Sequence, residues 1–179
     1  MVAYHAGAEG SEYTLDGWLG TYERMGHSTV IFVRERVHLD RIAPTSLPIV
    51  VLPRAVDLEY FLLPSIKVAL YAAGNLKNSH LIRLRGIKDV FVGHGDSDKG
   101  TNVNPLARLY DEIWVAGPAA RERYARTRVG VRDEAIVEVG RPQLDVIERP
   151  GVRPRAGGEP LTVLYAPTWE GWNDDEFQT

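Results

Sequence analysis

The sequence predicts an α/β fold in which helices cover both faces of a parallel β-sheet. Short runs rich in β-branched and aromatic residues alternate along the chain with segments whose apolar residues recur at helical spacing. This alternation is typical of parallel sheets whose strands are joined by helical crossovers. The 179 residues, 44% hydrophobic and 25% charged, are enough for one sizeable core but not for two complete domains of this kind.

The strand signals are continuous apolar runs, as expected for parallel strands that are buried on both faces. The opening segment, residues 1–7, is interpreted as a short strand that runs directly into a glycine-containing loop. The next two runs, 29–33 and 48–52, consist mainly of β-branched, aromatic and leucine residues. Further strands are predicted at 66–71, 89–92, 112–116 and 136–139.

Helix signals lie between these strands. A helix is predicted over 14–25, where four large apolar residues share one face and Gly26 then supplies a stop signal. A second helix is predicted to begin after Asn104, which serves as the N-cap and is followed by Pro105 at the first helical position. A third is predicted over 117–127.

The chain changes character near residue 140. Residues 140–160 contain four prolines and a Gly-Gly pair, so we interpret them as an interdomain linker. Residues 1–139 would then form one domain, and 161–179 would begin another with a single strand. Because one strand cannot make a domain, we expect the rest of the second domain to lie beyond Thr179.

Composition excludes several classes of function. The net charge of -3 and the lack of a long lysine or arginine block predict no nucleic-acid partner. The chain contains no cysteine, so it can form neither a disulfide framework nor a thiolate metal site. No stretch approaches about 18 uninterrupted apolar residues, and the amino-terminus lacks the pattern of a signal peptide. We therefore expect a cytoplasmic chain without a membrane-spanning segment.

The most informative segment is 90–101, where an apolar strand runs into a histidine between two glycines and then into a polar loop. Ligands of open α/β sheets collect at the carboxyl ends of strands, where this loop lies. Gly93 and Gly95 would let the backbone approach a ligand closely, and the imidazole of His94 could take a proton from an attacking hydroxyl. Lys99 could pair with a phosphate. The alternative is a solvated turn in which His94 only hydrogen-bonds the backbone.

Asp96, Ser97 and Asp98 continue this loop and allow two interpretations. The two aspartates match the metal-binding pair of one transferase class, in which carboxylates hold a divalent cation against a nucleotide diphosphate. A two-residue pattern is a weak signal, and the preceding His-Gly does not belong to that class. We therefore favour aspartates that cap the turn and orient His94 or Lys99, and we expect no bound metal.

Other polar residues carry weaker signals. His5 follows the first strand and is a lower-ranked candidate for substrate contact, because one histidine near one glycine is a common coincidence. A basic segment before the His94 strand either receives a phosphate-rich acceptor or anionic lipid head groups, or is a solvated helix face. That segment comprises 75–80 with Arg83, Arg85 and Lys88. The residues interpreted as structural or core are His27, His38, Trp18, Tyr110 and Trp114.

Three motifs, in the same order along the chain, resemble those of one known family. His94-Gly95 to Lys99 keeps the spacing of a His-Gly-Thr-Pro-x-Lys motif. Residues 139–145 resemble a Gly-x-Pro-Arg-x-Asp turn, and 163–169 resemble a Leu-Tyr-Ala-Pro-Thr-Trp strand. The family is that of the CDP-glycerol glycerophosphotransferases, which build teichoic-acid-type polymers. The resemblance is good over 89–169, whereas the earlier part of the chain matches only in general pattern.

The resemblance implies the amino-terminal half of a GT-B fold, a Rossmann-like domain that forms one wall of a cleft between two domains. His94 would be the catalytic base. The implied substrate-binding residues are Gly93, Gly95, Asp96, Ser97, Asp98, Lys99, His5, Arg141 and Thr168. No cofactor is implied, and the nucleotide would bind mainly to the second domain, so this chain would be inactive alone.

The sequence departs from the family pattern in two places. Residues 96–98 replace Thr-Pro-x, and Gln143 stands where an arginine is usual, which leaves the identity of the acceptor open.

The reaction implied by the resemblance moves glycerol phosphate, or a related polyol phosphate, from a CDP-linked donor to a membrane-associated acceptor. It would serve the synthesis of teichoic acid or another cell-surface polymer. The partners would be that donor and a polymer or lipid-linked acceptor. The membrane surface is an optional partner, and the protein would then attach peripherally to the inner face of the cell membrane. Two alternatives stay open: a sugar-nucleotide glycosyltransferase of the same GT-B fold, and a non-catalytic module that binds an acceptor.

Overall fold

The computed structural model describes residues 1–96, 104–147 and 163–165. The chain divides into two units, Met1–Val146 and Ile147–Thr179, and the first contains every strand and helix described below. This unit extends past the predicted boundary at residue 139, because the 3-10 turn Pro142–Leu144 packs against one of its helices. Most of the predicted linker and second domain lies outside the described residues, so that part of the division stays a prediction.

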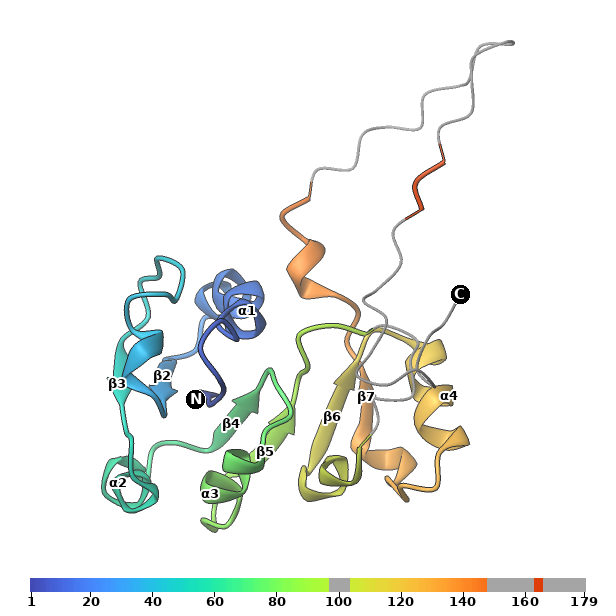
Figure 1. Ribbon diagram of the computed structural model, residues 1–179. Helices are drawn as coiled ribbons and strands as arrows, with labels where there is room; N and C mark the ends of the chain where they lie inside the picture. The colour runs from blue at the N-terminus through green and yellow to red at the C-terminus, as the bar shows by residue number, and fades with distance from the viewer. Residues whose placement is uncertain (97–103, 148–162, 166–179) are drawn as a thin grey trace. The chain divides into compact units, whose positions relative to one another are not determined.

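Within the described residues, seven parallel strands form one sheet in the order β3-β2-β1-β4-β5-β6-β7 (Figure 1). The predicted parallel α/β fold is therefore confirmed, and every predicted strand segment in this unit is present with slightly shifted bounds. The strands are β1 (Val2–His5), β2 (Val30–Val33), β3 (Ile49–Val51), β4 (Val68–Tyr71), β5 (Lys88–Phe91), β6 (Glu112–Val115) and β7 (Ile136–Glu138).

The strand order creates a topological switch point between β1 and β4. From β1 the sheet continues to one side through β2 and β3, and from β4 to the other side through β5, β6 and β7. Val2 of β1 pairs with Val30 on one side and with Ala69 on the other. In open α/β sheets, ligands bind outside the carboxyl ends of the strands at such a point. The ends of β1 at His5 and of β4 at Tyr71 therefore mark where a site is expected.

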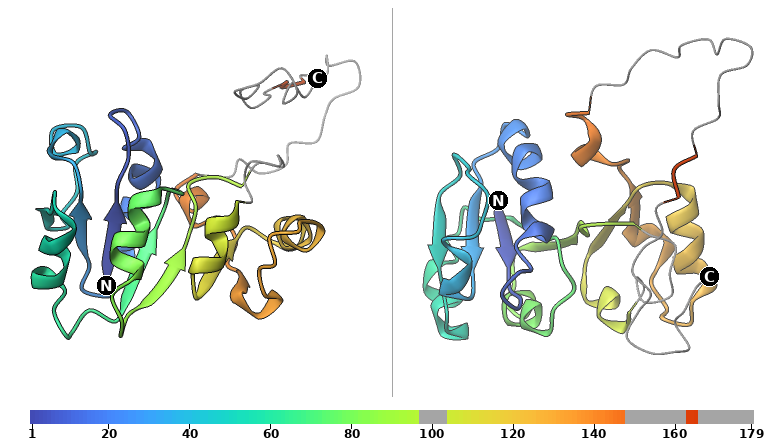
Figure 2. Two further views of the ribbon diagram at one scale, coloured as in Figure 1. Left: turned by 60° about the horizontal axis from the view of Figure 1, so that its bottom comes forward. Right: turned by 45° about the horizontal axis from the view of Figure 1, so that its top comes forward.

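Helices cover both faces of the sheet, as predicted (Figures 1 and 2). On one face lies α1 (Tyr13–Arg24), whose apolar stripe around the buried Trp18 packs against strand residues. On the other face, α2 (Ala55–Phe61), α3 (Ser79–Ile82) and α4 (Pro118–Arg126) contribute apolar side chains to a second cluster. In the part of the chain that the structure describes, none of these helices has the length and apolar character needed to cross a membrane.

The helices α1 and α4 confirm two of the three predicted helices, and the third differs. Asn104 is an N-cap, since its side chain accepts from the amide of Leu106 at 2.9 Å. The segment that it caps is a 3-10 turn, Pro105–Leu109, because β6 begins soon afterwards at Glu112. The helices α2 and α3 have no predicted counterpart, because they contain only 7 and 4 residues and are too short for a helical period to show.

Candidate active site

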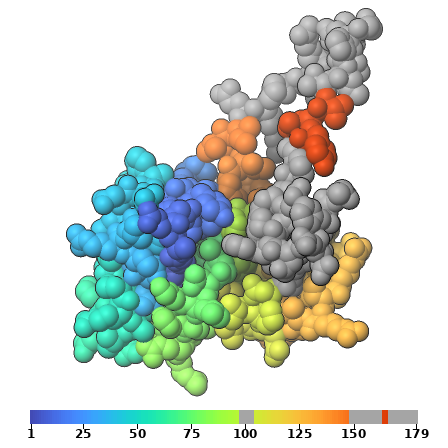
Figure 3. Space-filling view, in the orientation of Figure 1, coloured from blue at the N-terminus to red at the C-terminus, as the bar shows by residue number. Residues whose placement is uncertain are grey.

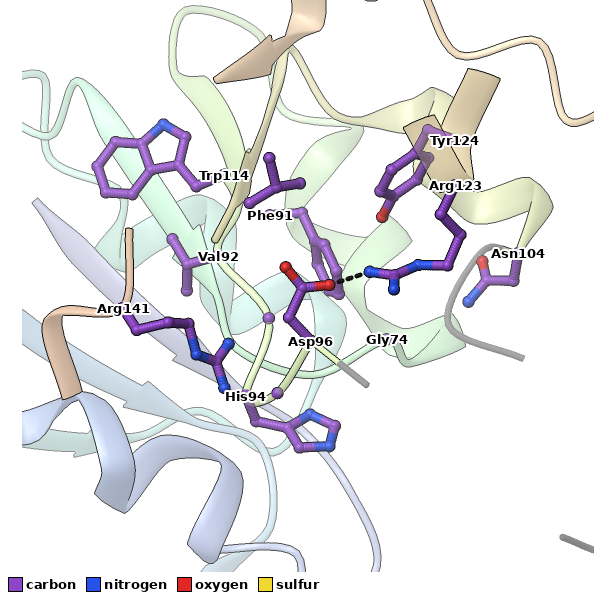
Figure 4. Close-up of a pocket in the computed structure, with 13 residues that line it drawn as sticks. Gly74, Phe91, Val92, His94, Asp96, Asn104, Trp114, Arg123, Tyr124 and Arg141 are labelled. Carbon is purple, nitrogen blue, oxygen red and sulfur yellow. Dashed lines mark hydrogen bonds and ion pairs between the residues drawn. The ribbon is translucent and has the colours of Figure 1, made fainter. Parts of the chain in front are cut away.

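A cavity of about 200 Å³ opens at the carboxyl ends of β5 and β6 (Figure 4). Its wall is built by the loop after β5, by β6, by α4 and by the segments around Gly74 and Arg141. Trp114, predicted to be a core residue, is only half-buried and lines this cavity. The sequence-predicted site residues that the cavity brings together are Gly93, His94, Gly95, Asp96 and Arg141.

Backbone hydrogen bonds hold the turn that carries His94. The amides of Val92 and Gly93 both donate to the carbonyl of Tyr71, at 2.9 and 3.3 Å, so the loop leaves β5 bound to the end of β4. Gly93 has a φ of +62°, in the left-handed region that favours glycine. Its carbonyl accepts from the indole N–H of the buried Trp18. Glycine at position 93 is therefore explained by the turn itself, before any contact with a ligand.

The imidazole of His94 is exposed, and two of its contacts with described residues orient it. Nδ1 lies 3.3 Å from the carbonyl oxygen of Ala72, which can only accept, so this nitrogen carries the proton of the neutral ring. The ring of Tyr13, at the start of α1, meets the imidazole edge to face with centroids 5.5 Å apart. Nε2 then carries the lone pair, which is what a general base needs. Both contacts reach His94 from segments at the switch point between β1 and β4.

Both carboxylate oxygens of Asp96 interact with the protein. Oδ2 accepts from the backbone amide of Ala116 at 2.9 Å, and Oδ1 forms an ion pair with Arg123 of α4. The side chains of Asp96 and Arg123 are only 14% and 11% exposed. Asp96 therefore links its loop to the end of β6 and to α4, whereas the sequence interpretation had it cap the turn and orient His94 or Lys99. Its predicted contact with substrate stays a prediction.

Arg141 reaches the same cavity from the end of β7. Gly140 has a φ of +77°, and the turn that it allows brings the 3-10 turn Pro142–Leu144 back onto α1. In Figure 4 the guanidinium of Arg141 extends towards His94. Among the residues that the structure describes, this guanidinium forms neither a hydrogen bond nor an ion pair. The lining of the cavity thus includes both an oriented imidazole and a guanidinium.

Some predicted site residues lie outside the described residues. Lys99 matters most among them, because it is predicted to pair with a phosphate beside His94. Asp98 bears on the metal alternative, which needs a second carboxylate next to Asp96. The contacts of all the predicted site residues outside the described part of the chain stay predictions. These residues are Ser97, Asp98, Lys99 and Thr168.

The fold resembles part of a wall teichoic acid polymerase. The structure of the wall teichoic acid polymerase TagF matches with a TM-score of 0.52 and 16% sequence identity over 82% of this chain. A TagF variant with one histidine replaced by alanine gives a TM-score of 0.50 and 16% identity over 79% of the chain. The sequence matches no protein-family model, and a search of curated proteins found no significant match.

At this level of identity the likeness to TagF shows the fold alone. The predicted resemblance to teichoic-acid transferases is confirmed in that sense, because the parallel α/β sheet matches part of TagF. The chain spans about 40% of the length of the TagF chain that it matches. Activity, substrates and partners are therefore matters for proposal.

His5 lies outside the cavity, and its side chain is buried. Its ring meets that of His38 edge to face with centroids 4.6 Å apart, and its Nε2 lies 3.4 Å from the hydroxyl oxygen of Ser11. The structure does not bring His5 together with His94. The predicted contact of His5 with substrate therefore stays a prediction, while its observed contacts are with a polar network inside the protein.

His38 is the centre of this buried network. Its Nδ1 lies 2.7 Å from the Glu12 carboxylate, and its Nε2 lies 3.2 Å from the Gly7 carbonyl oxygen and 3.3 Å from the Glu35 carboxylate. Each ring nitrogen faces acceptors, and both are satisfied only when each carries a proton. The network joins the segments that follow β1 and β2, which lie side by side in Figure 3. The burial of His38 agrees with the structural interpretation, whereas its partners could not be predicted from the sequence.

The network perturbs the ionisation of its members. Burial, followed by the neighbouring charge of His38, lowers the pKa of His5 to about 4. Burial opposes ionisation of Glu12, but the hydrogen bond from His38 outweighs it and holds the pKa below its usual value. For Glu35, burial is similarly outweighed by hydrogen bonds from Lys77 and the Gly7 amide, so its pKa is also lowered. In each case the folded state favours the deprotonated form of the group, and this form is lost as the pH falls.

Acid should therefore destabilise the fold through His5. Its pKa is lowered from 6.5 to about 4, so the unfolded chain takes up this proton first. The stabilisation is complete above about pH 6.5 and declines towards pH 4, by roughly 3 kcal/mol in all. Denaturant unfolding at pH 4 to 8 measures it, with His5→Phe as a variant that keeps a ring but cannot titrate. From pH 8 to pH 4, the free energy of unfolding of the wild type should fall by about that amount more than that of the variant. A difference between the two proteins that does not change with pH would contradict the expectation.

The basic segment before β5 carries little unbalanced charge. Its ion pairs are Lys77 with Glu35, Arg83 with Glu59, and Lys88 with Glu112. The ring of His80 is held by the buried Arg34, with Nδ1 and the guanidinium nitrogen 2.8 Å apart. Because these pairs cancel most of the local positive charge, the structure favours a solvated surface over an anion-binding one for this segment.

Proposed function

We propose that the protein to which this chain belongs transfers glycerol phosphate, or a related polyol phosphate, from a CDP-linked donor to a hydroxyl of a membrane-associated acceptor, with His94 as general base. The observation that carries this proposal is the orientation of His94. Nδ1 contacts the carbonyl of Ala72, so Nε2 is the basic atom beside the cavity. The likeness to TagF supports the substrate class, since that protein is a wall teichoic acid polymerase.

The proposed reaction is a displacement at phosphorus. The oxygen of the acceptor hydroxyl forms a bond to the phosphorus that carries the polyol, the bond from that phosphorus to the bridging oxygen breaks, and CMP leaves. Nε2 of His94 takes the proton of the attacking hydroxyl. Cations must also balance the charge on the phosphoryl oxygens, and Arg141 and Lys99 are the candidates on this side of the site.

The nucleotide that leaves tests the proposal. The protein, in the form in which the cell makes it, should release CMP from CDP-glycerol when a membrane acceptor is present. CDP should inhibit about tenfold more strongly than UDP or GDP, as expected if one hydrogen bond reads the base. Stronger inhibition by UDP or GDP, with transfer of a sugar, would instead identify a glycosyltransferase of the same fold. Binding of an acceptor without turnover of any donor would favour a non-catalytic module.

A further inference from the structure

A further cavity, of about 220 Å³, lies at the amino edge of the sheet, where the strands begin. It is formed between residues 107–110, which lead into β6, and residues 130–135, which lead into β7 (Figure 1). Because all the strands run parallel, this edge is opposite the carboxyl ends that surround His94. Among the described residues, this amino-edge cavity shares no lining residue with the cavity beside His94, so the two can hold different ligands.

The floor of the amino-edge cavity is apolar. Ala107, Tyr110 and Ala135 line it and are each 6% exposed. The hydroxyl of Tyr110 accepts a hydrogen bond from the side-chain amide of Asn78 at 2.8 Å, so this polar group is already satisfied inside the protein. Val131 adds a side chain that packs against the hydrophobic cluster containing Tyr110. The floor therefore favours a short hydrocarbon or aromatic group over a fully hydrated ion.

Two arginines from different segments supply the charge of this cavity. Arg108 and Arg132 both line it and are exposed. The side chain of neither arginine forms a hydrogen bond or ion pair with a residue that the structure describes. Two like charges at one cavity repel each other, and an anion between them replaces this repulsion by attraction. Arg108 and Arg132 are thus placed to hold one anion together.

Nearby carboxylates do not neutralise the two arginines. Among the described residues that line the cavity there is no aspartate or glutamate. The carboxylate of Asp133, next to Arg132, is engaged by Arg121 at 2.7 Å, and that of Asp111 accepts from a backbone amide. Glu134 is exposed and forms no ion pair with any described part of the chain. The cavity therefore keeps an unbalanced positive charge.

We propose that the amino-edge cavity binds a small phosphate monoester, held by Arg108 and Arg132, at a site separate from the one that contains His94. This inference goes beyond the proposed function and does not depend on it. A phosphate monoester has three terminal oxygens and roughly two negative charges at neutral pH, so two guanidinium forks can hold it at once. A carboxylate offers only two oxygens, which a single fork occupies. The apolar floor would contact the organic group of the ester.

The size of the amino-edge cavity limits the ligand. Its volume of about 220 Å³ is below the roughly 300 to 1,000 Å³ of pockets that enclose drug-sized ligands. A phosphate that carries one short or aromatic group is small enough, whereas a nucleoside diphosphate belongs to the drug-sized class. The bound ester would join the segment before β6 to the segment before β7. Because it binds only the folded chain, it should raise the midpoint of thermal unfolding.

Titration of the 179-residue chain with phenyl phosphate tests this proposal, with inorganic phosphate and succinate as comparison ligands. The amide NMR signal of Gly130 reports binding in the amino-edge cavity. Arg108→Gln and Arg132→Gln should each weaken the binding of phenyl phosphate by about tenfold or more, the effect of one charge-assisted hydrogen bond. Arg36→Gln, at an exposed position outside the cavity, is the matched control and should bind like the wild type. Inorganic phosphate, which has no group for the apolar floor, should bind more weakly than phenyl phosphate.

Equal affinity of the wild type and both glutamine variants for phenyl phosphate would overturn the proposal. If succinate binds as tightly as phenyl phosphate, the site holds dicarboxylates and the phosphate assignment is wrong. If phenyl phosphate shifts the ring signals of His94 but not the amide of Gly130, the phosphate lies in the other cavity and the proposal fails. Thermal unfolding of each variant without ligand shows whether a loss of binding reflects a loss of fold. His94→Ala should bind phenyl phosphate like the wild type, so a failure of the proposed reaction leaves this site standing.

Discussion

Replacement of His94 by alanine is expected to reduce turnover by about 10² to 10⁴-fold, the usual contribution of a general base. The contact of Nδ1 with the carbonyl of Ala72 makes Nε2 the proton acceptor. Alanine removes this acceptor while leaving Gly93, whose backbone conformation sets the turn, in place. The measurement is CMP release from CDP-glycerol by the protein in the form in which the cell makes it, at saturating donor and acceptor, so that kcat values are compared.

Two further variants sharpen this comparison. His27→Ala, at an exposed position just before β2, is the matched control and should leave kcat unchanged. His94→Gln can still accept a hydrogen bond from the hydroxyl but cannot take its proton, so it should be about as slow as His94→Ala. If either variant at position 94 turns over at the wild-type rate, His94 is not the base.

The sequence predicted the sheet well because parallel strands carry a strong local signal. The run at 29–33 and the glycine-flanked turn at His94 are each visible within a few residues. The order of the strands was not predicted, because it depends on which runs pair across the sheet. Val2, for example, pairs with Val30 and Ala69, and nothing in its local sequence selects either partner.

Side-chain partners in the site were harder to predict, because they depend on where distant segments fold. The carboxylate of Asp96 pairs with Arg123, which is 27 residues away in the sequence. Glu12 and His38 are 26 residues apart, and only the packing of the segments after β1 and β2 brings them together. The motif at 139–145 indicated a functional turn, but which of its side chains reaches the cavity depends on the backbone at Gly140.

The second large effect is expected on stability, at His38. Its replacement by alanine should lower the free energy of unfolding by about 3 to 5 kcal/mol, the usual result of breaking a buried charge pair. His38 is 0% exposed, and Glu12 is 5% exposed. Without the imidazole, the carboxylate of Glu12 would stay buried without its hydrogen-bond donor, and the carbonyl of Gly7 would lose its donor. Urea unfolding at pH 7 measures the loss, which is a large part of the roughly 5 to 15 kcal/mol typical of a domain.

A double variant separates the charge from the packing in this network. Glu12→Gln combined with His38→Gln removes both charges and keeps polar side chains, so it should cost less than His38→Ala alone. A loss below about 1 kcal/mol for His38→Ala would contradict a role in neutralising a buried carboxylate. The effect should also reach the cavity, because the segment 7–12 leads into Tyr13, whose ring contacts His94. Faster amide exchange over 7–12 and shifted His94 ring signals in His38→Ala, but not in His27→Ala, would show that this network positions the base.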